Sequence, residues 1–238
     1  MIVNVGSVSF NVCADKNEDF KFWKSVNCGR WESHTFKIFK QFSDIDHSII
    51  DIGGYIGPTV LYGAHFARHV YTIEPDVVAL HSLKKNVSLN SNLSSKVSIC
   101  KCGISDKSGF TKLRAYGKFK LGGSGSTIML NSKKTNQEIL IKLITFQNFI
   151  DLYNIIDCNF IKMDVEGAEF LILPTMLNYL SIFKPTLYIS FHNVAKPKKA
   201  IIAIEELFSK YPNICNAKTG KTIKLHEIFI TKEVLAHF

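Results

Sequence analysis

The fold of this chain is decided by the stretch Ser48-Ile-Ile-Asp-Ile-Gly-Gly-Tyr-Ile-Gly-Pro-Thr59, which a helical run joins to His69-Val-Tyr-Thr-Ile-Glu-Pro-Asp76. Isoleucines at 49, 50 and 52 are typical of a buried strand, and a glycine-rich turn follows them. Pro58 fits the first position of a helix, where its missing backbone N–H costs nothing. Val70–Ile73 then predicts a second strand. A strand, a turn, a helix and a strand in this order indicate an α/β protein with a doubly wound sheet.

The turn after the first strand suits a nucleoside ligand without phosphate. The second strand ends on Glu74, 17 residues after Gly57, which is about the interval at which an acid reaches a ribose hydroxyl. The dinucleotide fingerprint G-x-G-x-x-G fails, because Tyr55 stands where its second glycine would be. The carboxylate of Asp51 would repel phosphate but attract an amine or a sulfonium, and S-adenosylmethionine carries both. A tight turn that binds no ligand is the alternative.

Composition indicates a soluble globular protein of one domain. The chain has 238 residues, of which 46% are hydrophobic and 21% are charged. Its net charge of +9 is compatible with a nucleic acid, an anionic membrane or an acidic substrate as partner. However, Arg30, Arg68 and Arg114 are its only arginines, and they form no basic patch interleaved with aromatic residues, which disfavours nucleic acid.

The sequence shows no targeting signal. No apolar stretch is long enough to span a membrane, and no basic residue precedes Lys16 as a signal peptide would require. We therefore expect a cytoplasmic protein, with attachment to a membrane surface through lysines as an open alternative.

Six cysteines are present without a C-x-x-C pair, and Cys100 and Cys102 would lie on one face of a strand. Small buried thiols are the expectation, because a zinc site would need the usual ligand spacing.

The N-terminal part is expected to form a hairpin and a helix. Weak alternation over Ile2–Val5 and Val8–Val12 predicts the hairpin, and residues 15–28 are expected to be a loop. Trp31 and Glu32 then open an amphipathic run that predicts a helix. These two residues line the mouth of the cofactor site, or else Trp31 only packs in the core and Glu32 is an acid of the first turn that the helix dipole favours.

The segment after the second strand continues the α/β pattern and then breaks it. Val97–Cys100 predicts a third strand, and Ser105 follows at the exit where a doubly wound fold binds adenine, unless it only belongs to a local turn. Residues of about 107–145 are expected to form an antiparallel insertion. Its glycine-serine loop, residues 122–126, is either a lid or a plain connector. Near the C-terminus, Leu225–Thr231 predicts the last strand.

A second informative stretch is Cys158–Glu169, which reads as a buried strand, acids, a glycine and a helix. Asp164 and Glu166 alternate, so both carboxylates can point into the cleft at the sheet edge where such folds bind ligands. Glu169 would lie in the first turn of the helix, where the helix dipole favours it. His192 ends the next strand at the same edge. It is a candidate general base because its ordinary pKa is near neutral, and a structural histidine is the alternative.

Together these residues resemble the FkbM family of S-adenosylmethionine-dependent methyltransferases, over about residues 31–208. The segments that carry the resemblance are Trp31-Glu32, Asp51-Ile-Gly-Gly-Tyr-Ile-Gly57, Ile73-Glu-Pro-Asp76, Leu83-Lys-Lys-Asn-Val-Ser-Leu-Asn90, Gly103-Ile-Ser-Asp106 and Phe160-Ile-Lys-Met-Asp-Val-Glu-Gly-Ala-Glu169, of which the last is the most diagnostic. The resemblance implies a Rossmann-like, doubly wound sheet of seven mainly parallel strands with helices on both faces. Residues 47–238 would form a class I methyltransferase domain, with 1–46 packed on it in one structural domain.

The resemblance also implies what the residues do. The methyl group would go to an oxygen, usually on a sugar, glycan, glycolipid or polyketide-like molecule. The residues expected to bind the cofactor are Glu32, Asp51, Gly53, Gly54, Tyr55, Gly57, Glu74, Pro75, Gly103, Ile104, Ser105 and Asp164. Asp51, Gly53 and Gly57 would hold the methionine end, and Glu74 the ribose. Asp164 would stand near the transferred methyl group, with Glu166 and His192 facing the acceptor.

Asp164, Glu166 and His192 are therefore the expected catalytic residues. No metal ligand is assigned, and a divalent metal held by these three side chains is the less favoured variant. Two positions depart from the family pattern: related sequences tend to have an aspartate at Gln147 and a glutamate at Ser190. The rival interpretations are an RNA methyltransferase, because of the charge, and a non-catalytic nucleoside-binding protein of the same fold. The glycine that Tyr55 replaces disfavours a dehydrogenase.

Overall fold

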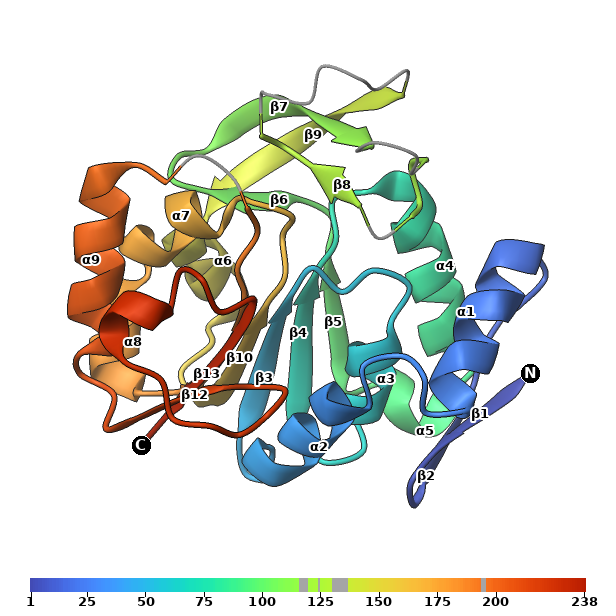
Figure 1. Cartoon of the computed structure of the whole chain (residues 1–238). Coiled ribbons are helices and arrows are strands. Elements are labelled where there is room, and N and C mark those ends of the chain that lie inside the picture. The colour runs from blue at the N-terminus through green and yellow to red at the C-terminus, as the bar shows by residue number, and fades with distance from the viewer. Residues whose placement is uncertain (116–119, 124, 130–136, 194–195) are drawn as a thin grey trace.

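The computed structural model describes residues 1–115, 120–123, 125–129, 137–193 and 196–238, and its centre is a seven-stranded sheet (Figure 1). The strand order is β12-β13-β11-β10-β3-β4-β5. The strands are β3 (Ser48–Ile52), β4 (His69–Ile73), β5 (Val97–Cys100), β10 (Cys158–Met163), β11 (Thr186–Ser190), β12 (Asn213–Asn216) and β13 (Glu233–His237). β13 pairs antiparallel with both of its neighbours, and the other pairs are parallel. The predicted doubly wound, mainly parallel sheet is confirmed.

Helices cover both faces of this sheet (Figure 1). One face packs against α2 (Ser33–Phe42), α3 (Pro58–Gly63), α4 (Val77–Ser88) and α5 (Ser91–Ser94). The other packs against α6 (Phe146–Tyr153), α7 (Glu169–Ile172), the 3-10 turn η1 (Leu173–Thr175), α8 (Leu177–Phe183) and α9 (Lys198–Phe208). In β3, Ile49 faces the first layer while Ile50 and Ile52 face the second. Burial on both faces explains why this strand reads as a continuous apolar run.

Local chemistry fixes where the helices next to the sheet edge begin. Pro58 stands at the start of α3, directly after Gly57, whose φ of +100° lies in the left-handed region. The side chain of Asp76 caps α4 by accepting hydrogen bonds from the backbone N–H groups of Val78 at 2.9 Å and Ala79 at 3.4 Å. Both helices therefore start at the carboxyl edge of the sheet.

The N-terminal part contains the predicted hairpin, β1 (Ile2–Val5) with β2 (Val8–Asn11), followed by α1 (Asn17–Asn27). The expectation of a loop over residues 15–28 was wrong. Trp23 and Val26 are the buried residues of α1, and a buried face this narrow among charged residues gives little periodicity. The hairpin contacts the C-terminal end of α4: the side chain of Asn90, two residues after this helix, accepts a hydrogen bond of 2.8 Å from the backbone N–H of Asn11.

The insertion forms a second sheet above the carboxyl edge of the first (Figure 1). Its order is β6-β9-β7-β8, with β6 (Gly103–Ser105), β7 (Gly109–Ala115), β8 (Ser126–Thr127) and β9 (Glu138–Thr145). β7 pairs antiparallel with β8 and with β9, as expected for this region. Part of the predicted glycine-serine loop, residue 124, lies outside the described residues.

The last strand does not lie where the sequence predicted it. Within Leu225–Thr231 the chain forms the 3-10 turn η2 (Leu225–Glu227), and the strand is β13. Ile230 is 81% exposed, whereas Val234–Ala236 are all buried, so the apolar run predicted as a strand is not the one that enters the core. In the part of the chain that the structure describes, no helix has both the length and the apolar character needed to cross a membrane.

Candidate active site

A cavity opens at the carboxyl ends of β3, β4, β10 and β11, beneath the insertion sheet. The turn Gly53–Tyr55 and the strand end Glu74–Asp76 line one part of it. Asp164–Glu166 and His192 line the other. The insertion contributes further wall residues, which are Leu113, Gly123, Ser126 and Ile128. The cavity thus occupies the place where doubly wound folds bind their ligands.

The turn after β3 is held tightly by the protein itself. A Cβ atom on Gly53 would lie 2.1 Å from the backbone oxygen of Asp164, and one on Gly54 would lie 2.1 Å from the Thr72 hydroxyl oxygen. Both backbone N–H groups donate to the carbonyl of Ile73, at 3.0 and 3.1 Å. The glycines therefore let β3, β4 and β10 converge at the cavity, quite apart from any ligand.

Glu74 is a buried carboxyl group in the cavity wall. Its Oε2 accepts from the Tyr55 N–H and its Oε1 from the Asp76 N–H, both at 2.8 Å. Burial raises the pKa of Glu74 to about 8, and the two hydrogen bonds offset this only in part. Pro75 and Ile104 lie on the same wall and present apolar surface beside the carboxyl group.

Nine of the twelve residues expected to bind the cofactor line this cavity: Glu32, Gly53, Gly54, Tyr55, Glu74, Pro75, Gly103, Ile104 and Asp164. The structure places the other three outside the lining. Asp51 is fully buried below it, Gly57 is the residue before α3, and the Ser105 hydroxyl donates to Asp106 at 3.0 Å. Cofactor binding by any of the twelve residues stays a prediction.

Lys162 is a site residue that the sequence analysis missed. It is only 5% exposed, yet it lines the cavity from β10. Its Nζ lies 3.5 Å from Oδ1 of Asp51 and 3.9 Å from Oδ2 of Asp164. Burial alone would lower the pKa of Lys162, but the charges of Asp51, Asp164 and Glu32 raise it above its ordinary value. The sequence signal that could have identified Lys162 is its position as a charged residue within an otherwise apolar, buried strand.

Asp51 is neutralised inside the protein. Besides the ion pair with Lys162, its Oδ2 accepts a hydrogen bond of 2.6 Å from the Thr59 hydroxyl of α3. In the sheet, Asp51 lies directly opposite Lys162 of β10, so the pairing follows from the strand register. Asp51 therefore acts on the cavity through Lys162 and α3.

Aromatic rings form the mouth of the cavity. Phe22 of α1 makes edge-to-face contacts with Trp31 and with Tyr55, with 5.3 Å between ring centroids in each pair. Beside them lies Glu32, whose pKa is raised chiefly by burial. The structure thus places both Trp31 and Glu32 in the cavity lining, while α1, taken for a loop, supplies the third ring.

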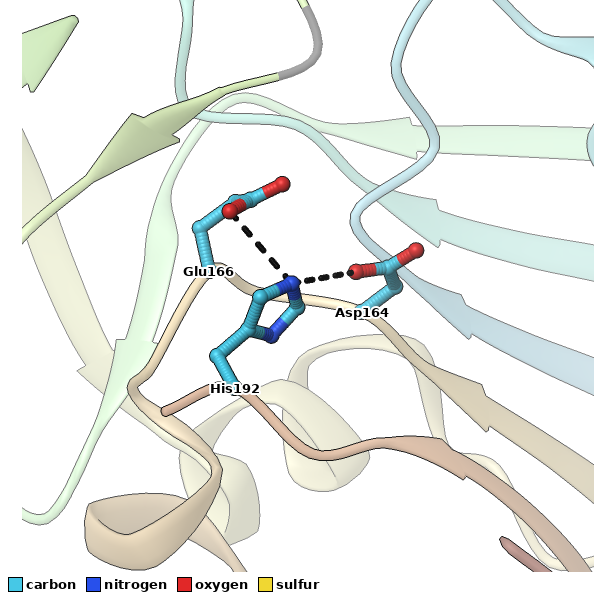
Figure 2. A group of neighbouring side chains, drawn as sticks. All are labelled: Asp164, Glu166 and His192. Carbon is cyan, nitrogen blue, oxygen red and sulfur yellow. Dashed lines mark ion pairs between the residues drawn. The ribbon is translucent and has the colours of Figure 1, made fainter. Parts of the chain in front are cut away.

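Asp164, Glu166 and His192 meet at the other end (Figure 2). Figure 2 shows the imidazole between the two carboxylates: Nε2 lies 3.3 Å from Oε2 of Glu166 and 3.7 Å from Oδ1 of Asp164. Nδ1 lies 2.9 Å from Oε1 of the fully buried Glu169. Glu166 has a φ of +53°, which is strained for a residue with a side chain and is the kind of strain found at functional sites.

The ionisation of this group is shifted from its ordinary values. Burial alone would lower the pKa of His192, but the hydrogen bond that its Nδ1 donates to Glu169 and the charges of Glu169, Glu166 and Asp164 raise this pKa to about 9. Burial raises the pKa of Glu166 to about 7, although the charge of His192 opposes this. Such shifts mark candidate functional groups.

The two departures from the family pattern differ in their position. Ser190 lines the cavity next to His192, whereas Gln147 lies on α6 and donates to Asp151 at 2.8 Å. Glu233, the first residue of β13, and Lys232 directly before it also line the cavity, and the sequence analysis missed both, since it placed the last strand elsewhere. No local pattern marks them as neighbours of β11.

Cys100 and Cys102 give no support to a zinc site. Their Sγ atoms lie 3.0 Å apart in the core, so the expectation of buried thiols holds for this pair. Asp164, Glu166 and His192 form the one group of this kind among the described residues: three or more His, Cys, Asp or Glu side chains whose ligand atoms all lie within 4.8 Å of one another.

A doubly wound sheet of this order, with a cleft at its carboxyl edge, is the architecture of class I methyltransferases. The chain belongs to the FkbM methyltransferase family: the profile of the methyltransferase FkbM domain matches residues 51–220. Its cofactor is S-adenosylmethionine, the methyl donor of this family. The curated proteins contain no match to the chain.

Solved structures show the same fold. The chain is similar to a methyltransferase FkbM from Methylobacillus flagellatus KT, with 16% identity and a TM-score of 0.51. That match covers 94% of this chain but 56% of the other, so this chain spans little more than half the length of that relative. It is also similar to a TehB-like SAM-dependent methyltransferase from Corynebacterium glutamicum, with 10% identity, a TM-score of 0.50, and 92% and 94% of the two chains covered.

The residues present fit this cofactor. Each oxygen of Glu74 accepts one backbone N–H and keeps a further lone pair for a hydroxyl group, which a ribose offers. Pro75 and Ile104 provide an apolar wall for a base. The carboxylates of Glu32 and Asp164 favour a cationic amine or sulfonium and disfavour phosphate.

Proposed function

We propose that this protein transfers a methyl group from S-adenosylmethionine to a hydroxyl oxygen of a small molecule of the sugar, glycan, glycolipid or polyketide-like class. The observation that carries the proposal is a single cavity with two chemically different ends. Glu74 and the glycine turn stand at one end, and Asp164, Glu166 and His192 stand at the other. A donor and an acceptor can meet in such a cavity, and positioning supplies much of the rate in a transfer of this kind.

A hydroxyl group is the acceptor that the second end suits. The side chains of Asp164 and Glu166 are about one-third exposed, at 30% and 31%, so their oxygens can accept hydrogen bonds from a bound molecule. The same carboxylates would repel a phosphate backbone. This argues against RNA as the substrate, despite the net charge of +9.

When bound, S-adenosylmethionine supplies a methyl group that its sulfonium makes electrophilic. We assign Glu74 to the ribose hydroxyls and Asp164 to the junction between the two ends. Glu166 and His192 hold the acceptor hydroxyl with its oxygen toward the methyl group. Methyl transfer would release the hydroxyl proton, and Asp164 or Glu166 would accept it, because His192, whose pKa is raised to about 9, already holds its proton at neutral pH.

Binding of S-adenosylhomocysteine and methylation of an acceptor panel test this proposal. Calorimetry should show micromolar binding that Glu74→Gln weakens. Glu206→Gln, the same chemical change at an exposed position of α9, should leave it unchanged. Radiolabelled methyl transfer is then measured on glycans, glycolipids, polyketide alcohols and RNA.

The outcomes separate the candidate functions. Label on a hydroxyl of a small molecule supports the proposal, and label on RNA alone overturns it. Binding of S-adenosylhomocysteine without any transfer favours a non-catalytic nucleoside-binding protein, the candidate that Ser190 in the cavity encourages. Absence of binding in the folded protein contradicts both.

A further inference from the structure

Three side chains from two adjacent strand ends each present one ligand atom to the cavity. Asp164 and Glu166 follow β10, and His192 follows β11. Their ligand atoms all lie within 4.8 Å of one another, and Figure 2 shows them facing a common point. We propose that Asp164, Glu166 and His192 form a binding site for one divalent metal cation.

The histidine is oriented as a metal ligand would be. Its Nδ1 lies 2.9 Å from Oε1 of Glu169, so Nε2 is the nitrogen directed at the two carboxylates. Metal-bound histidines regularly make such a bond from their other ring nitrogen to a carboxylate, which fixes both the tautomer and the ring orientation. Glu169 therefore positions His192 without contacting the cation itself.

Glu169 leaves one of its own carboxylate oxygens without a partner in the described part of the chain. It is completely buried, and its Oε2 has no hydrogen-bond partner within the described residues. Its Oε1 accepts from the backbone N–H groups of Val165 and Gly167, both at 3.2 Å, as well as facing His192. A buried carboxylate with an unpartnered oxygen is costly unless a nearby positive charge compensates it.

Besides His192, Lys162 and Lys232 bring positive charge to this cavity. Burial raises the pKa of Glu166, and the charge of Lys232 opposes this increase. Three carboxylates, those of Asp164, Glu166 and Glu169, surround one imidazole. Lys162 lies 3.9 Å from Asp164, but it lies closer to Asp51, at 3.5 Å. A divalent cation at the common point would balance the remaining negative charge.

The donor set indicates the class of metal. Carboxylates suit magnesium and manganese, and imidazole suits the first-row transition metals, so Mn²⁺ satisfies both ligand types. The set of three holds no thiolate, unlike most closed structural zinc sites. The three side chains are 21–31% exposed, which leaves coordination positions for water or for an acceptor hydroxyl.

A cation here would act on the acceptor. A hydroxyl group bound to a divalent metal has a lowered pKa and so gives up its proton more readily. This consequence rests on the proposed function, whereas binding of the metal does not. Metal binding and cofactor binding can therefore be measured separately.

The test is a manganese titration of the full-length protein after treatment with EDTA, followed by calorimetry and by the electron paramagnetic resonance of free Mn²⁺. The wild type should bind one Mn²⁺ per chain. Glu166→Gln and His192→Asn should abolish binding. In the second variant the amide nitrogen takes the place of Nδ1 and keeps the bond to Glu169, while Nε2 is lost. Glu169→Gln should weaken binding by about tenfold.

Two controls distinguish loss of the metal site from a general effect of substitution or from unfolding. Glu206→Gln should bind Mn²⁺ as the wild type does, and retained binding of S-adenosylhomocysteine shows that each variant is folded. The proposal is overturned if the wild type binds no Mn²⁺ up to about 1 mM, or if both ligand variants bind like the wild type. Mn²⁺ binding without S-adenosylhomocysteine binding would support the metal site and contradict the proposed function.

Discussion

The backbone N–H of Tyr55 donates a hydrogen bond of 2.8 Å to Oε2 of Glu74. This bond joins the turn after β3 to the residue that follows β4, so the glycine turn and the candidate ribose acid are fixed relative to each other. Tyr55 adopts a φ of +51° to make the turn, a strained value that the surrounding hydrogen bonds support. Hydrogen bonds within the protein thus define the shape of the cofactor end of the cavity.

Affinity for S-adenosylhomocysteine should rise with pH up to about 8. Burial raises the pKa of Glu74 to about 8, so much of this carboxyl is protonated at neutral pH. Ribose hydroxyls donate best to the ionised form, so binding should follow the ionised fraction. Between about pH 6 and pH 8 the dissociation constant should fall by up to about tenfold per unit and then level off. Calorimetry across this range measures the effect.

Two variants show whether Glu74 causes this dependence. Glu74→Gln cannot ionise, so its weaker binding should no longer vary with pH in this range. Glu206→Gln on α9 should retain the wild-type profile. A wild-type affinity that is flat from pH 6 to pH 8 would contradict the raised pKa of Glu74 or its contact with the ribose.

The same carboxyl should make stability depend on pH. In the folded protein the pKa of Glu74 is about 8, above its ordinary value of 4.5, so the folded state holds a proton that the unfolded state has released. The contribution of Glu74 to stability is therefore fully present below about pH 4.5, decreases as pH rises to about 8, and is constant above. The free energy of unfolding of Glu74→Gln, relative to that of the wild type, should be higher by a few kcal/mol at about pH 8.5 than at about pH 5.5. Denaturant unfolding of both proteins at the two pH values measures this difference. An identical difference at both values would contradict the shift.

Lys162→Met should destabilise the protein by about 3–5 kcal/mol, because it leaves Asp51 buried without its counter-ion. Urea unfolding measures this change. Lys198→Met, at an exposed position of α9, should have little effect. Adding Asp51→Asn to Lys162→Met should restore much of the loss, since asparagine still accepts from Thr59 but carries no charge. Additive losses in the double variant would show that the two residues do not interact.

The sequence predicted those parts of the fold that local patterns specify. Ile49–Ile52, the glycine turn and Pro58 form a strand, a turn and a helix start, because burial, backbone freedom and a fixed φ each act over a few residues. The loop expected over residues 15–28 and the strand expected at Leu225–Thr231 were wrong. In both places tertiary packing decides, through Trp23 in α1 and through Val234–Ala236 in β13.

Residues of the candidate site were likewise predictable where a local pattern positions them. Glu74, Asp164 and His192 were predicted to lie at one sheet edge, since each follows a parallel strand, and the structure brings them into one cavity. Lys232 and Glu233 could not be predicted, because they reach the cavity through a strand that pairs antiparallel with β11. Asp51 lies outside the cavity lining, where the strand register pairs it with Lys162, and its contact with a ligand stays a prediction.

Thr127→Val should loosen the insertion over the cavity while leaving cofactor affinity unchanged. The Thr127 hydroxyl donates to the backbone oxygen of Glu166 at 2.7 Å, and the N–H of Met129 donates to the same hydroxyl at 3.1 Å. Valine keeps the shape but removes both bonds, each worth about 1 kcal/mol.

Hydrogen exchange over residues 125–129 should therefore become about fivefold to thirtyfold faster, as 1–2 kcal/mol of lost local stability implies. Mass spectrometry of the peptide that contains this segment measures it. Thr175→Val is the matched control, because the Thr175 hydroxyl donates to the Ile172 carbonyl at the same distance of 2.7 Å, in η1. It should leave exchange at 125–129 unchanged. If Thr127→Val also leaves this exchange unchanged, the contact with Glu166 does not hold β8 in place and does not link the insertion to the acceptor end of the cavity.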